Sequence, residues 1–288
     1  MSSCFCPGHV SCVFQPFTSL NPLATGSRGF GIRLSLGAHC DVSVRDDPKT
    51  VISVDGVESD APITRLAVEA LSGGRGFDVS ITNDLPVSQG FGMSAAGALS
   101  AAMCVANETG HSISDAVHAA HIAEIKGGGG LGDVAAIAAG RDMPVRIVPG
   151  IPPYGRVENT RGRMDGICLA VLGPKIVTSD ILSNPNKVIR IRSAADNAIS
   201  RFMSERTLDS LYREANVFSR ESGLESDAVE DALGKLHARG YRAGMCMLGN
   251  SIFTDAPVSV VRAMLDLDAS DVFSCNSYCD DLQVTRKA

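Results

Sequence analysis

A chain of 288 residues is long enough for one large hydrophobic core or two smaller ones. Apolar residues make up 44% of the sequence and charged residues 20%, so the composition excludes extensive disorder. The net charge of −6 argues against nucleic acid as the main ligand, and no apolar run reaches the roughly 18 to 20 residues of a membrane span. We therefore expect a cytoplasmic protein that binds a small molecule.

The first half of the chain alternates between strand and helix signals. Alternating apolar and polar residues predict strands over residues 29–44, 51–54 and 77–81. Helical spacing of apolar residues, bounded by proline or glycine, predicts helices over residues 62–71, 94–106, 114–126 and 133–139. The helix over 94–106 is rich in alanine, so we expect it to be buried.

The segment 149–153, Pro-Gly-Ile-Pro-Pro, predicts a linker that divides the chain into domains 1–150 and 151–288. Beyond it, helical spacing predicts helices over residues 193–218, 227–239 and 257–267. Strands are expected over residues 167–172 and 271–274, and a strand-turn-strand unit over 245–253. Helices on one face of a sheet, without strict alternation of strand and helix, predict an α+β fold of split βαβ type.

The nine cysteines are spread along the chain and form no Cys-x-x-Cys pair. Two other close spacings, Cys4-x-Cys6 and Cys275-x3-Cys279, have no matching second pair. A zinc site usually needs two such pairs, so we expect reduced, buried thiols and no metal bound by cysteine.

The segment 86–97 carries the clearest chemical signal, because a Gly90-x-Gly92 turn joins a predicted strand to a predicted helix. Glycine lets the backbone bend tightly, and the N–H groups at the start of the helix then favour a phosphate. The turn is not a Walker loop, since no Gly-Lys-Ser/Thr follows, and its third glycine, Gly97, excludes the G-x-G-x-x-G pattern. A purely structural turn would also favour glycine, so the turn alone leaves both interpretations open.

The same segment resembles the phosphate loop of the GHMP kinases, whose pattern is Pro-x-x-x-Gly-Leu-Gly-Ser-Ser-Ala. The chain departs from this pattern with Phe91 in place of leucine and Met93 in place of the first serine. The resemblance implies an ATP-dependent kinase. The residues that it implies bind the phosphates of ATP are Pro86, Gly90, Phe91, Gly92, Met93, Ser94, Ala95 and Ala96.

Further segments resemble the same family, so the resemblance extends over nearly the whole chain. Residues 6–10, Cys-Pro-Gly-His-Val, resemble its opening Pro-Gly motif, with His9 where many members carry lysine. Residues 243–251, Ala-Gly-Met-Cys-Met-Leu-Gly-Asn-Ser, occupy the place of its third motif in a form similar to archaeal pantoate kinases, a branch of the family. The resemblance implies the GHMP kinase fold, with an N-terminal mixed α/β lobe of the ribosomal-protein type and a C-terminal ferredoxin-like split βαβ lobe.

Two carboxylates follow the loop at positions that suit phosphoryl transfer. Glu124 lies three residues after His121 on a predicted helix and so shares a face with it, and Asp133 begins the next predicted helix. The resemblance implies that Glu124 and Ser94 bind Mg²⁺, whereas Asp133 orients or deprotonates the attacking hydroxyl. Considered singly, Glu124 could be a solvated helix residue, Asp133 a helix cap and His121 an interior histidine.

The resemblance to pantoate kinases implies phosphorylation of the primary hydroxyl of pantoate to 4-phosphopantoate, a step of coenzyme A synthesis. Pantoate carries a carboxylate and hydroxyl groups, so its site needs a fixed cation and polar partners. An inward Arg146 would bind the carboxylate with two hydrogen bonds, although strand alternation equally allows it to point outward. The expected substrate-binding residues are Ser27, His121, Arg146 and Thr178.

Two alternatives remain open at this point. The Gly-Phe-Gly-Met form of the loop also suits a kinase of another small alcohol, such as mevalonate or homoserine. The same scaffold could also serve a non-catalytic protein that binds a nucleotide or metabolite. The joint presence of Ser94, Glu124 and Asp133 favours a kinase. The resemblance further favours a homodimer, whereas the charge and the lack of a long apolar run argue against a nucleic-acid or membrane partner.

Overall fold

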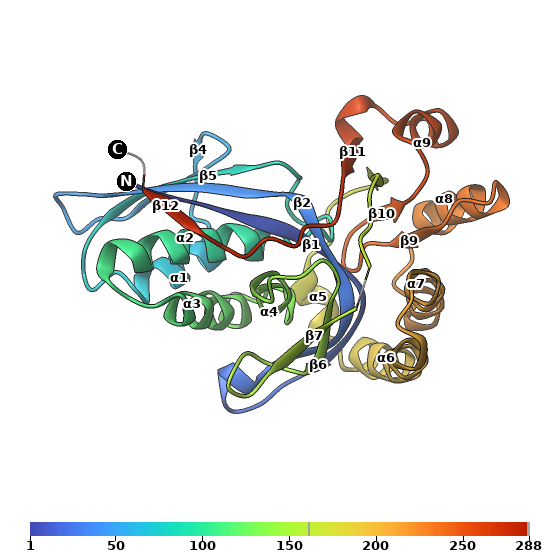
Figure 1. The fold of residues 1–288 in the computed structure, drawn as a ribbon, viewed down its shortest axis with the longest axis horizontal. Helices are drawn as coiled ribbons and strands as arrows, with labels where there is room; N and C mark the ends of the chain where they lie inside the picture. The colour runs from blue at the N-terminus through green and yellow to red at the C-terminus, as the bar shows by residue number, and fades with distance from the viewer. Residues whose placement is uncertain (161, 287–288) are drawn as a thin grey trace.

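Two β-sheets organise the chain, of which the computed structural model describes residues 1–160 and 162–286 (Figure 1). The strands of the larger sheet are β1 (Ser2–Phe17), β2 (Gly26–Val44), β3 (Val51–Val54), β4 (Val57–Glu58), β5 (Phe77–Asn83), β6 (Pro144–Val148), β7 (Arg156–Asn159) and β12 (Val284–Arg286). Their order is β12-β1-β2-β5-β3-β4, and β6 pairs with both β2 and β7. The smaller sheet has the order β11-β8-β10-β9, and its strands are β8 (Ile167–Val171), β9 (Ala243–Met245), β10 (Ser251–Thr254) and β11 (Val272–Cys275).

The strands β1 and β2 form a long antiparallel pair that curves through the middle of the molecule (Figure 1). The register of this pair shifts between Pro7 and His9, and again between Ser11 and Val13. Such irregularities bend a strand and re-aim its side chains. At the first of them, a side-chain carbon on Gly8 would lie 3.0 Å from the carbonyl oxygen of Phe91, so glycine allows β1 to approach the loop that follows β5.

Helices cover one face of the larger sheet (Figure 1). They are α1 (Pro62–Glu69), α2 (Met93–Thr109), α3 (Ile113–Lys126) and α4 (Asp133–Ala138). The helix α2 is buried along almost its whole length, because its many alanines are small and apolar on every side. This confirms the predicted burial and places the start of α2 beside the sheet.

The remaining helices are α5 (Thr178–Leu182), α6 (Pro185–Glu205), α7 (Leu208–Ser222), α8 (Asp227–Ala238) and α9 (Val258–Leu265), with short 3-10 turns at Pro22–Ala24 and Ala269–Asp271. The prediction of one helix over 193–218 was wrong, since α6 ends where Arg206 takes a left-handed conformation with φ of 49°. Thr207 then begins α7, because its side chain accepts a hydrogen bond from the N–H of Ser210, and the Ser210 hydroxyl accepts one from the N–H of Thr207.

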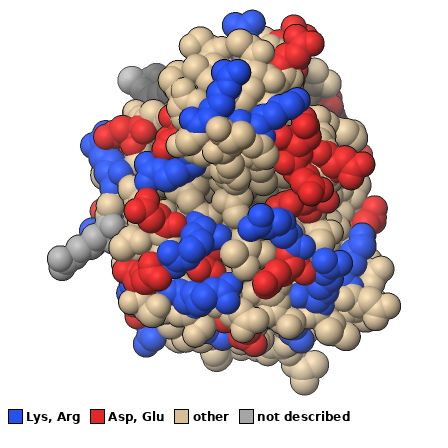
Figure 2. Space-filling model, turned by 90° about the vertical axis from the view of Figure 1, so that its right-hand side faces the viewer, with Lys and Arg blue, Asp and Glu red and all other residues tan. Residues whose placement is uncertain are grey.

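Basic and acidic side chains are interspersed on the face formed by the C-terminal helices (Figure 2). Several of them pair across α6 and α7: Glu214 accepts hydrogen bonds from Arg201 at 2.8 Å and from Arg213 at 2.9 Å. Arg213 also lies 2.7 Å from Glu205. Paired charges of both signs leave little net field on this face to attract a polyanion.

The predicted α+β class is confirmed by the two sheets and the helices packed on them. The division at residue 150 stays a prediction, and β7 and β12, which follow it, pair within the larger sheet. All nine cysteines are free, and Cys279 is exposed whereas the other eight are buried. Within the described residues, no helix is both long and apolar enough to span a bilayer.

Candidate active site

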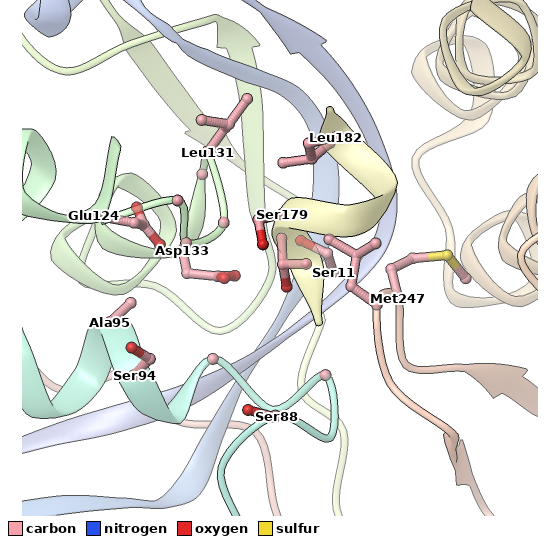
Figure 3. Close-up of a pocket in the computed structure, with 18 of the residues that line it drawn as sticks. Ser11, Ser88, Ser94, Ala95, Glu124, Leu131, Asp133, Ser179, Leu182 and Met247 are labelled. Atoms are coloured by element: carbon pink, nitrogen blue, oxygen red, sulfur yellow. The ribbon is translucent and has the colours of Figure 1, made fainter. Parts of the chain in front are cut away.

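A cavity of about 290 Å³ lies between the start of α2, the glycine-rich segment 127–132 and α5 (Figure 3). Figure 3 shows Ser94, Glu124 and Asp133 on one side of it. Ser179 and Leu182 of α5 lie on the other side, near Met247. The hydroxyl and carboxylate groups that line the cavity belong to Ser11, Ser27, Ser88, Ser94, Glu124, Asp133, Thr178 and Ser179.

The loop before α2 takes a conformation that depends on glycine. Gly90 and Gly92 have φ of 76° and 66°, and the non-glycine Ser88 has φ of 64°. A side-chain carbon on Gly90 would lie 2.7 Å from the carbonyl oxygen of Cys246. Among the described residues, no side chain caps α2. The first N–H of this helix to donate to the backbone is that of Ala96, which bonds to the carbonyl of Gly92 at 3.0 Å. The N–H groups before Ala96 are therefore available to an anion.

The three sequence motifs meet at this loop. The N–H of His9, in the first motif, donates to the carbonyl of Phe91 at 2.9 Å. From the third motif, the hydroxyl of Ser251 donates to the carbonyl of Gln89 at 2.5 Å. The N–H of Met247 donates to the carbonyl of Ser11 at 3.1 Å, which joins the third motif to the residue that follows the first motif. Segments far apart in the sequence thus hold the loop in one shape.

Glu124 is a buried acid without a counter-charge bonded to it. Its side chain is 2% exposed, and its Oε2 has no hydrogen-bond partner among the described residues. Burial, and next the charge of Asp133, raise the pKa of Glu124 well above its ordinary value. A side-chain carbon on Gly130 would lie 2.6 Å from Oδ2 of Asp133 and 3.4 Å from Oε1 of Glu124, so glycine keeps the space between the two carboxylates open.

These residues fit a magnesium ion. Mg²⁺ prefers oxygen ligands, and the cavity offers the unpartnered Oε2 of Glu124 and the hydroxyl of Ser94. In the described part of the chain, no group of three or more His, Cys, Asp or Glu side chains is placed to hold a metal. The ion would therefore need oxygens from a phosphate or water as well as from the protein.

Asp133 begins α4 and reaches the cavity with a side chain that is 24% exposed. Its Oδ1 lies 2.7 Å from Nδ1 of His9, whose side chain is fully buried. Burial lowers the pKa of His9, against the opposing effect of Asp133. The sequence predicts Asp133 as a site residue, whereas its contact with His9 on β1 depends on tertiary packing.

Arg146 on β6 lies behind the cavity wall and is 2% exposed. Its guanidinium donates to the hydroxyl of Ser11 at 3.2 Å and to the carbonyl of Val13 at 3.4 Å. Burial lowers the pKa of Arg146, and its Nε has no partner among the described residues. A side-chain carbon on Gly132 would lie 2.3 Å from Oγ of Ser27 and 2.7 Å from that Nε, so the absence of a side chain at Gly132 lets both groups lie beside its backbone.

The other expected substrate residues divide into two groups. Ser27 and Thr178 line the cavity. His121 is not among the lining residues, and its Nε2 lies 3.2 Å from the carbonyl of Pro22 and 3.0 Å from that of Thr25. The lining residues that were not predicted as site residues include Ser11, Ser88, Ser179 and Met247. Of these, Ser11 could have been predicted from sequence, because it lies two residues after His9 on one strand and residues two apart share a face of the strand.

A second cavity, of about 270 Å³, adjoins the first on the far side of the loop. The two share Ile63, Ser88, Met93, Ser94 and Gly127. The apolar residues that line the second cavity are Val54, Ala61, Pro62, Ile63, Ile81, Val87 and Met93. An apolar pocket beside an anion site suits a ligand with an aromatic base at one end and phosphates at the other.

Comparison with known proteins identifies relatives of the whole chain. The family described as "GHMP kinases N terminal domain" matches residues 62–141. The chain is 29% identical to a pantoate kinase of Thermococcus kodakarensis over 86% of this chain and 85% of that protein. It is 25% identical to a pantoate kinase of Methanocaldococcus jannaschii over 95% and 99% of the two chains.

A solved structure described as a "phosphotransferase related to CoA biosynthesis pathway" matches with a TM-score of 0.89 and 26% identity. That match covers 99% of this chain and 98% of the other. The family match includes the loop, Glu124 and Asp133, and the structural match covers both sheets. The predicted GHMP kinase fold is thereby confirmed, and residues 62–141 match the N-terminal domain of the GHMP kinases.

Proposed function

We propose that this protein is a pantoate kinase, which transfers the γ-phosphoryl group of ATP to the primary hydroxyl of pantoate and so forms 4-phosphopantoate for coenzyme A synthesis. The observation that carries the proposal is the convergence of Ser94, Glu124 and Asp133 on one cavity at the start of α2. The pantoate kinases among the relatives, which align over most of their own length, support the choice of substrate.

ATP would lie across the two adjoining cavities. Its phosphates fit the start of α2, where free N–H groups and the helix dipole attract an anion. Its base and ribose fit the apolar cavity on the other side of Ser88 and Ser94. The residues proposed to bind ATP are those of the loop and the first turn of α2: Pro86, Gly90, Phe91, Gly92, Met93, Ser94, Ala95 and Ala96.

Magnesium would be held by Glu124 and Ser94 together with phosphate oxygens. When bound, the ion neutralises negative charge on the phosphates, which favours transfer of the phosphoryl group. A nearby cation would also keep Glu124 ionised, against the burial that raises its pKa.

Asp133 is the proposed base for the acceptor. The primary hydroxyl of pantoate donates a hydrogen bond to this carboxylate, which orients the oxygen toward the γ-phosphorus. As the new oxygen–phosphorus bond forms, the bond from that phosphorus to the bridging oxygen of ADP breaks, and the hydroxyl proton passes to Asp133. The products are ADP and the phosphate monoester.

Four residues are proposed to bind the substrate directly or to support the residues that do. Ser27 and Thr178 line it and can bond to hydroxyl or carboxylate oxygens of pantoate. Arg146 lies directly behind Ser27 and supplies the positive charge that a carboxylate needs. His121 acts indirectly in this proposal, because its ring holds the carbonyls of Pro22 and Thr25, just before Ser27.

The proposal is tested by incubating the protein with ATP and Mg²⁺ and measuring ADP in the presence of pantoate, mevalonate or homoserine. We expect ADP formation with pantoate and only background with the other two alcohols. Robust turnover of mevalonate or homoserine without turnover of pantoate would contradict the assignment of pantoate as the substrate. No turnover of any alcohol would favour the non-catalytic alternative.

A further inference from the structure

His9 has no part in the chemistry described so far, yet it lies between two charged side chains. Its ring is fully buried. Nδ1 lies 2.7 Å from Oδ1 of Asp133, and Nε2 lies 3.5 Å from Nη1 of Arg146. The three side chains thus form a row that leads from the interior of the protein to the cavity.

The chemistry of the two neighbours fixes the tautomer of this histidine. A guanidinium carries only hydrogen-bond donors, so Nε2 of His9 can bond to Arg146 only as an acceptor without a proton. The single proton of the neutral ring then lies on Nδ1, from which it is donated to Asp133. Burial lowers the pKa of His9, which agrees with a neutral ring.

The surrounding backbone fixes the position of the ring. The N–H of His9 donates to the carbonyl of Phe91, so the residue is attached to the phosphate loop. Gly31 lies opposite, and a side-chain carbon there would be 2.4 Å from Nε2 of His9. The absence of a side chain at Gly31 therefore makes the space that the ring fills. The ring is held by both the loop and the neighbouring strand.

The bond from His9 also selects the oxygen of Asp133 that can react. Oδ1 is engaged by His9, whereas Oδ2 has no hydrogen-bond partner within residues 1–160 and 162–286. Oδ2 lies beside Gly130, in the space between the two carboxylates. One oxygen is thus held still and the other is left for the acceptor hydroxyl.

We propose that His9 is the positioning residue of Asp133: as the Nδ1–H tautomer set by Arg146, it holds Oδ1 and leaves Oδ2 to face the acceptor. This inference rests on the proposed role of Asp133 as the base. His9 keeps its own proton throughout, since the hydroxyl proton of the acceptor passes to Oδ2. A neutral histidine supplies no full positive charge here, so its contribution is orientation of the carboxylate.

The test compares His9→Asn with His9→Gln. The amide nitrogen of asparagine lies close to the place of Nδ1 and can still donate to Asp133, whereas that of glutamine lies close to the place of Nε2 and cannot. We expect kcat to fall about 10- to 100-fold in His9→Gln, as for other residues that orient a reacting group, and much less in His9→Asn. The KM for ATP should change little in either variant.

The matched control is the pair His39→Asn and His39→Gln, because His39 also lies beside a carboxylate, with Nε2 at 3.2 Å from Oδ2 of Asp84, but is exposed. Both His39 variants should keep the wild-type kcat. Equal losses in His9→Asn and His9→Gln, or a rise in the KM for ATP without a fall in kcat, would overturn the proposal.

A second measurement separates this inference from the substrate assignment. The ¹⁵N chemical shifts of the His9 ring report its tautomer without any turnover. We expect a neutral ring with the proton on Nδ1, and a proton on Nε2 or on both nitrogens would overturn the proposal even in an active enzyme. If the wild-type protein does not phosphorylate pantoate, the proposed function fails, and these shifts still decide the geometry at His9.

Discussion

The backbone of Gly92 lies against the backbone of His9: a side-chain carbon on Gly92 would be 3.0 Å from the carbonyl oxygen of His9 and 3.1 Å from its nitrogen. Gly92 also has φ of 66°, a conformation that L-residues rarely adopt. Contact with β1 and backbone conformation thus both require glycine at the point where α2 begins.

We therefore expect Gly92→Ala to destabilise the protein by about 1 to 3 kcal/mol and to raise the KM for ATP, because the N–H groups at the start of α2 are displaced. Denaturant unfolding and ADP production measure the two effects. The control is Gly234→Ala within α8, where a side-chain carbon would meet no atom within 4 Å. It should stabilise the protein by up to about 1 kcal/mol and leave the KM unchanged. A normal KM in Gly92→Ala would contradict the role of this loop.

Asp133→Asn should lower kcat by about 100- to 10,000-fold, which is the usual contribution of a general base. Asparagine has the same shape as aspartate, and its amide oxygen can still accept the hydrogen bond from His9. The KM for ATP should therefore stay near the wild-type value. The rate of ADP production decides the outcome, and an unchanged rate would show that Asp133 is not the base.

Glu124→Gln should raise the Mg²⁺ concentration needed for half-maximal activity at least about tenfold, because an amide oxygen is a weaker ligand than a carboxylate. Without Mg²⁺, the variant should unfold at the same temperature as the wild type or higher, since it removes a buried group that is costly to ionise. Glu221→Gln, on the exposed end of α7, is the control. An unaltered Mg²⁺ requirement in Glu124→Gln would exclude this residue as a ligand.

The buried His121 should make the protein less stable in mild acid. Burial lowers its pKa from the ordinary 6.5, so as pH falls the unfolded chain takes up the proton before the folded protein does. Its stabilising contribution is complete above about pH 6.5 and is lost as pH falls from there through the lowered pKa, at about 1.4 kcal/mol for each pKa unit.

Two variants test this dependence. His121→Gln keeps a donor near Nε2 for the carbonyls of Pro22 and Thr25, so it should weaken the pH dependence at little cost in stability. His121→Leu should cost about 1 to 3 kcal/mol at every pH, because those carbonyls lose a buried partner. Denaturant unfolding between pH 7.5 and 5 measures both. Wild-type pH dependence in His121→Gln would mean that another group is responsible.

Local sequence was enough to predict the glycine turn and the helix that follows it, whereas the prediction that the turn binds phosphate came from the family resemblance. Gly90 and Gly92 are required by backbone conformation, and the alanines of α2 by close packing, so each feature has a signal within a few residues. Glu124 and Asp133 were predicted as site residues from the family resemblance, and they lie near the end of α3 and at the start of α4, on either side of the glycine-rich segment.

Other features depend on contacts that the sequence does not display. His9 and Asp133 are separated by 124 positions, and their bond exists only because β1 and α4 pack together. Arg146 was predicted to bind the carboxylate of the substrate. Its position beside Ser27 and Gly132 depends on the pairing of β6 with β2, which the sequence does not display. The break between α6 and α7 was missed because Arg206 adopts a left-handed conformation without a glycine to signal it.

The central claim is transfer of phosphate to the primary hydroxyl of pantoate, and ³¹P–¹H NMR of the reaction product tests it most directly. We predict one new phosphate monoester whose phosphorus couples to the two methylene protons next to that hydroxyl, formed in equal amount to ADP. A phosphorus coupled to a single methine proton, or ADP formed together with inorganic phosphate and no ester, would contradict the account.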